Sequence, residues 1–170
     1  MTKPAEPHAR VARSGSIPWI EIKPAGKPAG FFAKRLGAAA GGRMLGATLY
    51  RIPAGAKSWP FHWHAGNEEA MWIVSGRGKA RIGEQAAEIA AGDYLALPTG
   101  PECAHQIVND SADDLVLLCF STMREPDIAY YPDSGKVGLF TIAAPGAVPP
   151  ADRPREFLRR DARVDYWDGE

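Results

Sequence analysis

The sequence predicts an all-β fold, a small antiparallel β-barrel or jelly roll, for the central part of the chain. Between residues 19 and 122, short segments rich in β-branched and aromatic residues alternate with turns that contain Gly or Pro. No segment in this stretch carries the apolar period of a helix. Many short strands at near-regular spacing are typical of a sandwich or a small barrel.

Ten strands are expected in this stretch, and glycine-containing turns such as PAG at 53–55 and AGD at 91–93 separate them. The alanine-rich run 84–91 is short and bounded by glycines, which favours a strand over a helix. Because alternate residues of a strand share a face, Glu69, Met71 and Ile73 are expected to point inward together. The expected strands are 19–23, 31–36, 44–52, 58–64, 69–75, 78–82, 86–90, 94–97, 105–109 and 115–122.

Composition divides the chain into three regions. Residues 1–16 are polar and rich in Pro, Arg and Ala, which predicts a flexible N-terminal arm. Residues 17–123 form the predicted β domain. Residues 124–170 form a C-terminal extension, which we expect to pack on the barrel or on a partner subunit. Within it we expect loops, a late strand at 137–142 and a short helix at 153–163, with Asp152 as N-cap and Pro154 in the first turn.

The chain has 170 residues, 45% of them hydrophobic and 24% charged, with a formal net charge of +0. This composition is typical of a soluble globular domain, and without clustered Lys and Arg no nucleic-acid partner is expected. The longest apolar run, 115–120, is too short to cross a membrane, and the N-terminal stretch lacks the apolar segment of a signal peptide. Two cysteines, Cys103 and Cys119, make no disulfide framework, so a cytoplasmic location is expected.

His62-Trp63-His64, followed by Glu69 and later by His105, is the most informative pattern in the chain. In a strand, residues two apart point to the same face, so both imidazoles of the His-x-His pair would project together. Imidazole nitrogens suit zinc, copper, iron or nickel, and a carboxylate also admits manganese. The pattern therefore predicts a site for one divalent transition metal ion, such as Zn, Fe, Mn or Ni, held by His62, His64, Glu69 and His105.

These residues stand in two motifs that resemble those of the cupin superfamily. The first runs from Gly55 through the His-x-His pair and Glu69 to Gly76, and the second runs from Gly92 through Pro98, Gly100 and His105 to Asn109. The gap from Gly100 to His105 is longer than the common family pattern. The resemblance covers roughly residues 44–120, and it implies a small β-barrel, a metal held by three histidines and one glutamate, and a homodimer. Residues 19–23 and the C-terminal helix are the candidates for the dimer contact.

Five further residues are candidates for the pocket or for support of the metal ligands. Glu68 competes with Glu69 as the ligand, because a slip of one residue in the strand reverses the faces. Cys103 lies two residues before His105, and its thiol is either a ligand or a small apolar group of a loop. The remaining candidates are the aromatic residue Trp59, the inward-pointing strand residue Met71 and Lys136, a cation of the YYPDSGK loop.

Three functions are compatible with such a site. The protein could be a metal-dependent enzyme of the sugar-phosphate isomerase type, and Lys136, Lys57 or Arg51 would then have to bind phosphate. It could be an Fe(II) dioxygenase, or it could be a module that binds or senses a small polar metabolite without turnover. Too few residues precede the first expected strand for a helix-turn-helix, so direct regulation of DNA is not expected.

Overall fold

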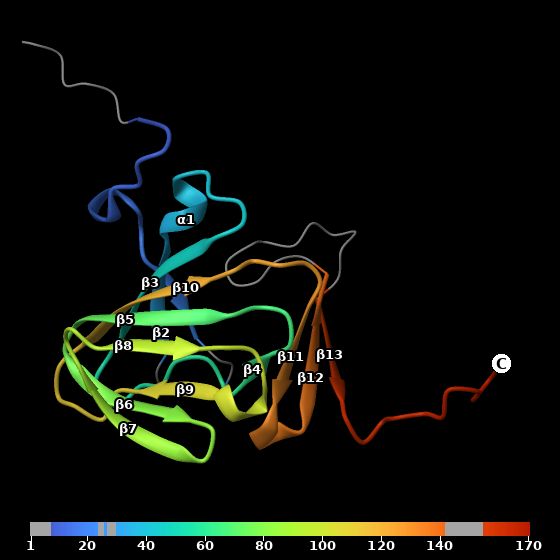
Figure 1. Ribbon diagram of the computed structural model, residues 1–170. Helices are drawn as coiled ribbons and strands as arrows, with labels where there is room; N and C mark the ends of the chain where they lie inside the picture. The colour runs from blue at the N-terminus through green and yellow to red at the C-terminus, as the bar shows by residue number, and fades with distance from the viewer. Residues whose placement is uncertain (1–7, 24–25, 27–29, 142–154) are drawn as a thin grey trace, which may run out of the picture.

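The computed structural model describes residues 8–23, 26, 30–141 and 155–170, and the described residues form three antiparallel sheets (Figure 1). The largest sheet has six strands in the order β1-β2-β3-β10-β5-β8. Its strands are β1 (Ile20–Ile22), β2 (Phe31–Arg35), β3 (Gly46–Ile52), β10 (Leu115–Ser121), β5 (Glu69–Ser75) and β8 (Tyr94–Leu97). This sheet carries Glu69 on its inner face.

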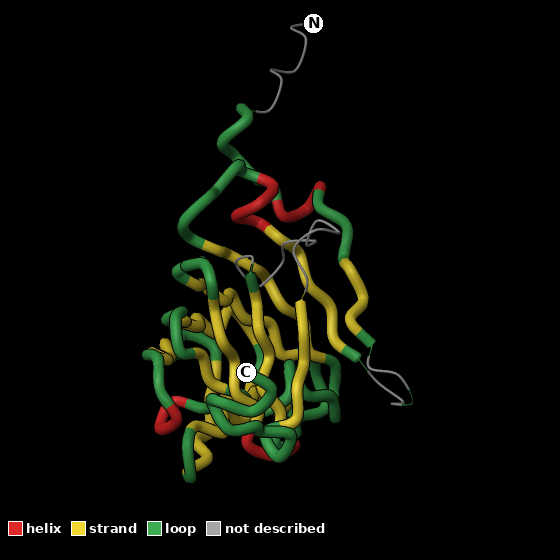
Figure 2. The backbone as a smooth tube through the Cα atoms, turned by 90° about the vertical axis from the view of Figure 1, so that its right-hand side faces the viewer, coloured by secondary structure: helices red, strands yellow, loops and turns green. Residues whose placement is uncertain are grey.

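Two smaller sheets complete the fold. The first has the order β13-β12-β11-β4, with β13 (Arg155–Arg159), β12 (Lys136–Phe140), β11 (Asp127–Tyr131) and β4 (Trp63–His64). The second has the order β7-β6-β9, with β7 (Gln85–Ala90), β6 (Arg77–Ile82) and β9 (His105–Val108). In Figure 2 the strands run side by side through the body of the molecule. The all-β prediction is confirmed as a jelly-roll sandwich, and among the described residues no strand pairing closes the sheets into a barrel.

The helical segments of the described chain are short. One α-helix, α1 (Leu36–Ala39), follows β2, and single 3₁₀ turns lie at Ser14–Ser16 (η1), Pro101–Cys103 (η2) and Pro132–Ser134 (η3). The Lys34 amine donates a hydrogen bond to the carbonyl of Ser14 at 2.7 Å, so the described part of the N-terminal segment contacts the large sheet. No helix among the described residues is long and apolar enough to span a membrane.

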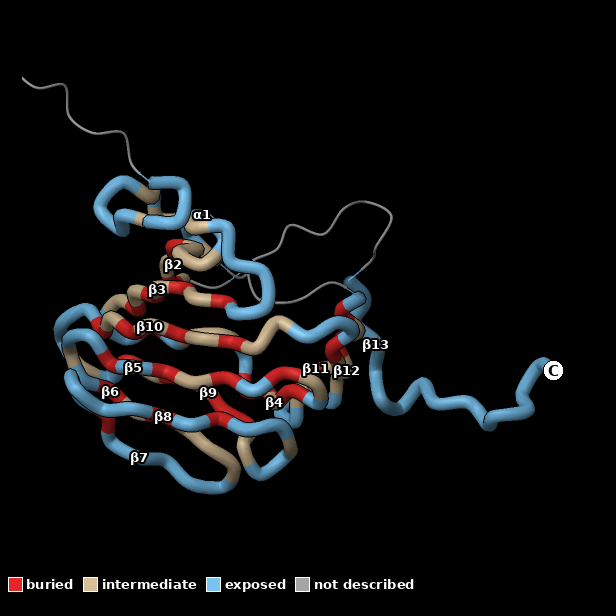
Figure 3. Tube along the Cα trace, turned by 45° about the horizontal axis from the view of Figure 1, so that its top comes forward, coloured by how far each residue is buried: buried red, intermediate tan, exposed pale blue. Residues whose placement is uncertain are grey.

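Alternating burial along the strands builds one main core. In β5, Glu69, Met71 and Ile73 are buried, whereas Trp72 and Val74 are exposed, as the period of two predicts (Figure 3). The core draws residues from every strand of the large sheet except β1 and from the β6–β7–β9 sheet. Because the buried carboxylate of Glu69 lies on the same face as this apolar core, it needs polar partners inside the protein.

Glycines close the turns where the sequence places them. Gly76 lies between β5 and β6 with a φ of 84°, and a Cβ at this position would clash with the backbone carbonyl of Asp114. Glycine reaches positive φ without the steric cost that other residues incur. The run 84–91 is a strand, β7, which pairs with β6 along its whole length. These turns set the register of the strands that carry the candidate ligands.

The C-terminal extension differs from the prediction in two places. The helix expected at 153–163 is wrong, because residues 155–159 form the strand β13, paired antiparallel with β12. All five residues of this strand pair with β12, and this pairing outweighs intrinsic helix propensity. The proposed cap, Asp152 and Pro154, lies outside the described residues. The sequence predicts a loop at residues 127–131, but these residues form the strand β11, which pairs with both β12 and β4.

Candidate metal centre

The His62–His64 pair lies at the short strand β4, with His62 just before the strand and His64 at its end. His62 and His105 exchange backbone hydrogen bonds, 3.2 Å from the His62 amide and 2.7 Å from the His105 amide, and so face each other across an isolated bridge. His62 and His64 are both buried, while Trp63 between them is only half-buried. The two imidazoles therefore share the inner face, as a His-x-His pair on a strand predicts.

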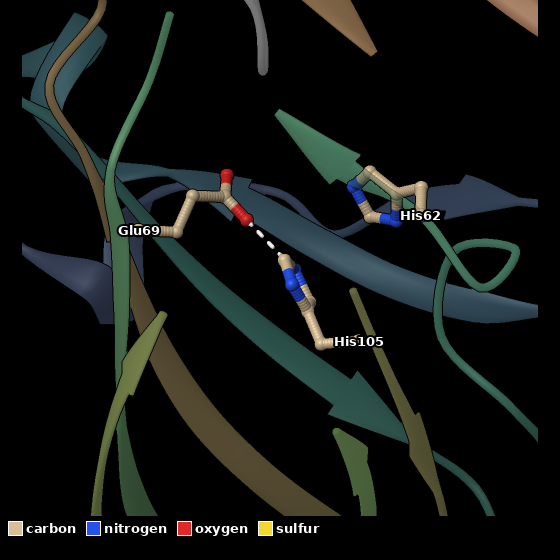
Figure 4. A group of neighbouring side chains, drawn as sticks. All are labelled: His62, Glu69 and His105. Carbon is tan, nitrogen blue, oxygen red and sulfur yellow. Dashed lines mark hydrogen bonds and ion pairs between the residues drawn. The ribbon is translucent and has the colours of Figure 1, made fainter. Parts of the chain in front are cut away.

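Three of the four predicted ligands come together in one buried group. His62, Glu69 and His105 each offer a ligand atom, and these atoms all lie within 4.8 Å of one another. His105 Nε2 lies 3.1 Å from Glu69 Oε2, and the His62 ring turns toward the same space (Figure 4). This group could hold a metal ion. His62 comes from the segment before β4, Glu69 from β5 and His105 from β9, so three elements distant in sequence build it.

His64 lies next to this group and outside it. Its Nε2 is 4.0 Å from Glu69 Oε2, and its ring centroid is 4.9 Å from that of His62. Its Nδ1 donates a hydrogen bond to Asp127 Oδ2 at 2.5 Å. Nε2 of His64 is therefore directed toward the carboxylate of the group, and His64 stays the proposed fourth ligand.

All three histidines are held by their Nδ1 atoms. Nδ1 of His62 lies 2.7 Å from the carbonyl of Pro60, and Nδ1 of His105 lies 3.0 Å from the carbonyl of Cys103. A hydrogen bond from Nδ1–H to an oxygen fixes the tautomer that leaves Nε2 free to bind a metal, which is the usual arrangement of metal-binding histidines. The donor set and its supporting hydrogen bonds thus fit a divalent transition metal.

Asp127 is the supporting residue that the sequence did not reveal. It is 63 positions from His64 along the chain, on a strand that was expected to be a loop. Its Oδ1 also accepts a hydrogen bond from the amide of Gly66 at 3.0 Å, so both carboxylate oxygens are used. No spacing rule connects an aspartate of the extension with the His-x-His pair, and only the pairing of β11 with β4 brings them together.

Burial and mutual contact shift the pKa values in this group. Burial, together with the neighbouring rings of His105 and His64, lowers the pKa of His62 to about 3. Burial raises the pKa of Glu69, but the hydrogen bond from His105 and the neighbouring histidines outweigh this and bring the pKa to about 2. For His64, burial lowers the pKa, whereas the contacts with Asp127 and Glu69 give a net rise. At neutral pH, Glu69 is ionised and His62 is neutral, the forms that bind metals.

The group opens into a cavity of about 310 Å³. Of the five candidates for the pocket, Trp59, Met71 and Lys136 line it, and Glu68 and Cys103 do not. Glu68 is exposed, and its amide donates to the Thr122 hydroxyl. Burial raises the pKa of the Cys103 thiol, and its contribution to the site is the carbonyl that meets His105. Glu69 is 5% exposed, which favours it over Glu68 as the ligand.

The β11–β12–β13 sheet forms one aromatic wall of this cavity. Tyr131 stacks on His62 with a centroid distance of 5.7 Å and an interplanar angle of 16°. Phe157 contacts Tyr131 and Phe140 edge to face. Burial raises the pKa of Tyr131 to about 12, so its hydroxyl stays protonated at neutral pH. This wall could not be predicted from the sequence, because the sequence places Tyr131 in a loop.

A jelly roll with a buried His-His-Glu group that opens into a pocket defines the class of the protein, a β-sandwich with a candidate metal site. Residues 48–121 match the family model for the cupin domain. This part of the chain is a cupin domain, and the resemblance to the cupin superfamily is confirmed.

Two solved structures are similar to nearly the whole chain. One is a provisionally assigned sugar phosphate isomerase from Acidithiobacillus ferrooxidans, with 26% identity and a TM-score of 0.75, covering 88% of this chain and 90% of that protein. The other is a sugar phosphate isomerase of the cupin superfamily from Silicibacter pomeroyi, with 25% identity and a TM-score of 0.73, covering 92% of this chain and 97% of that protein.

A cupin-2 domain from Rhodospirillum rubrum is similar at a lower level. It has 20% identity and a TM-score of 0.57, and the match covers 72% of this chain and 80% of that protein. This likeness supports the fold alone. Among curated proteins, none is similar enough to this chain to count as a relative.

Proposed function

We propose that this protein is a metal-dependent enzyme that isomerises a small sugar phosphate. The observation that carries the proposal is the buried group of His62, Glu69 and His105, which faces a cavity of the size of a small metabolite. The likeness of the whole chain to two proteins described as sugar phosphate isomerases supports the choice of reaction. The coarser conclusion, a cupin that could hold a metal and bind a small molecule, does not depend on this choice.

Aldose–ketose isomerisation moves a proton between two neighbouring carbons, one of which begins as a carbonyl. A bound divalent cation supplies Lewis acidity that polarises such a carbonyl. His62, His64 and His105 would hold the ion through Nε2, together with Oε2 of Glu69. The protein must then provide a group that takes the proton and returns it.

Glu69 is our candidate for that group. Among the described residues that line the cavity, it is the only carboxylate. Within the described part of the chain only its Oε2 bonds another side chain, which leaves Oε1 for a substrate proton. The protonated hydroxyl of Tyr131 and the aromatic wall would exclude water and orient the sugar.

Elemental analysis of the untagged protein is the first test, with His105→Ala as the variant that should lose most of the metal. The protein is then incubated with a panel of pentose and hexose phosphates in D₂O and followed by NMR. Isomerisation predicts conversion of one of them with deuterium entering at the carbon next to the carbonyl. No conversion with Zn, Mn, Fe or Ni would contradict the proposal.

Further measurements on the same metal-loaded protein separate the two other hypotheses. Oxygen consumption that requires ferrous iron would indicate a dioxygenase instead. Tight binding of a small molecule with no change in its NMR spectrum over hours would indicate a binding or sensing module.

A further inference from the structure

Three cations line the cavity from three different strands. They are Arg35 at the end of β2, Lys136 at the start of β12 and Arg155 at the start of β13. Arg35 and Lys136 are half-buried, and Arg155 is exposed. None of the three has an ion-pair partner among the described residues. Arg35 and Arg155 were not among the candidates that the sequence suggested.

Some cations elsewhere on the surface differ from these three. Several of them form ion pairs with nearby carboxylates, namely Arg51 with Asp114, Lys79 with Asp110 and Arg81 with Asp133. Arg51 and Lys57, which the isomerase hypothesis offered as phosphate ligands, do not line the cavity. At the cavity itself, three cations lie without an ion-pair partner among the described residues.

Lys136 is linked to the metal group through the ring of Tyr131. Its Nζ lies 5.5 Å from the centre of the Tyr131 ring, which itself lies 5.7 Å from the centre of the His62 ring. These two distances place Nζ no more than about 11 Å from the His62 ring. Arg155 lies on the same β12–β13 pair, where it is opposite Phe140, four residues along β12 from Lys136. At about 3.3 Å per residue the two backbones are roughly 13 Å apart.

The charge of the cavity favours an anion. Its single carboxylate, Glu69, is turned toward the histidines, whereas the three cations have no negative partner. Partly desolvated charges are costly unless paired, so an anionic ligand gains more here than in water. A phosphate three to five bonds from a carbonyl carbon lies roughly 4–6 Å from it, which is compatible with the upper limit on the distance between Lys136 Nζ and the His62 ring.

We propose that Lys136 binds the phosphate group of the substrate directly, and that Arg155 and Arg35 attract this group at the rim. That the phosphate belongs to a substrate rests on the proposed function. The anion site itself can be tested without turnover. It makes the C-terminal strands a specificity element, since β12 and β13 supply two of the three cations.

The test measures inorganic phosphate binding to the full-length protein, freed of metal by a chelator and dialysis, by calorimetry. Lys136→Gln should weaken phosphate binding about tenfold or more, and Arg155→Gln and Arg35→Gln by smaller factors, because a direct charge-assisted hydrogen bond exceeds a longer-range attraction. Lys136→Arg should restore most of the binding. The matched control is Lys57→Gln, which removes one exposed lysine outside the cavity and should change binding less than twofold.

The outcomes separate this inference from the isomerase proposal. If phosphate binding depends on Lys136 while no sugar phosphate is converted, the anion site stands and the isomerase proposal falls. If a sugar phosphate is converted and Lys136→Gln changes neither its KM nor phosphate binding, the anion site is wrong. Malonate provides the comparison with carboxylates, and tighter binding of malonate than of phosphate would overturn the assignment to phosphate.

Discussion

His64 donates a hydrogen bond from Nδ1 to Oδ2 of Asp127 across 2.5 Å, and this contact joins the cupin domain to the C-terminal extension. The two residues lie on β4 and β11, whose pairing places Ala129 opposite His64. Asp127 is almost fully buried, and its carboxylate is fully used by His64 and Gly66. The extension therefore takes part in orienting a proposed metal ligand in addition to forming a wall of the cavity.

Asp127→Ala is expected to lower metal affinity by about 10- to 100-fold, because the loss of a supporting carboxylate frees the ring of a metal-binding histidine. Titration with a fluorescent metal chelator gives the affinity, and circular dichroism checks that the fold is kept. Asp127→Asn is the matched variant: it keeps one hydrogen-bond acceptor and should lose less. Unchanged affinity in Asp127→Ala would show that His64 does not bind the metal.

The choice between the two neighbouring glutamates can be tested in the same way. Glu69→Gln should reduce metal occupancy strongly, because it removes the charge of the buried carboxylate beside His105. Glu68→Gln should leave occupancy nearly unchanged, because Glu68 is exposed and turned to the other face of the chain. Elemental analysis of the two purified variants measures the difference. The reverse ranking would assign the ligand to Glu68.

Most of the fold and of the metal group could be predicted from the sequence, since both depend on local patterns. The alternation in β5 fixed the inward face of Glu69, and the His-x-His spacing fixed that of His62 and His64. Asp127 and Arg155 could not be found in this way. Each reaches the site through a strand pairing, of β11 with β4 or of β13 with β12. A local pattern of apolar residues does not predict which strands will pair.

The buried hydroxyl of Ser121, next to Glu69, offers a test of how unpaired polar groups affect stability. Ser121 is 2% exposed and directly opposite Glu69 in the β10–β5 pairing, and its hydroxyl has no hydrogen-bond partner among the described residues. Because a buried hydroxyl without a partner is costly, Ser121→Ala should keep or raise the free energy of unfolding by up to about 1 kcal/mol. Urea denaturation measures this change. A loss of stability, or of metal in the folded variant, would show that the hydroxyl has a partner in the functional site.

A homodimer stays a prediction, and the outer face of the large sheet is its candidate surface. Trp72 and Tyr94 are 44% and 63% exposed and stand opposite each other in the β5–β8 pairing, next to the exposed Val74. An apolar group of this kind is typical of a protein interface. Sedimentation equilibrium should give twice the 18.3 kDa of one chain, and Trp72→Glu should shift the protein toward the monomer. A wild-type mass of one chain would contradict the prediction.

The free energy of unfolding of the metal-free protein should depend on pH partly through His62. Its pKa is about 3 in the folded protein and near 6.5 when unperturbed, because burial disfavours the charged ring. Between these values the unfolded chain binds a proton that the folded protein does not, so this contribution to stability is lost as the pH falls from 6.5 toward 3. Glu69, with its pKa lowered to about 2, acts in the same direction below pH 4.5, and His64, with a raised pKa, acts in the opposite one.

His62→Gln isolates the contribution of His62, because it removes the titrating ring. The stability of the wild type relative to this variant should therefore decrease from pH 7 to pH 4 in urea denaturation. A relative stability that rises on acidification would mean that His62 is protonated more readily in the folded protein than in the unfolded chain.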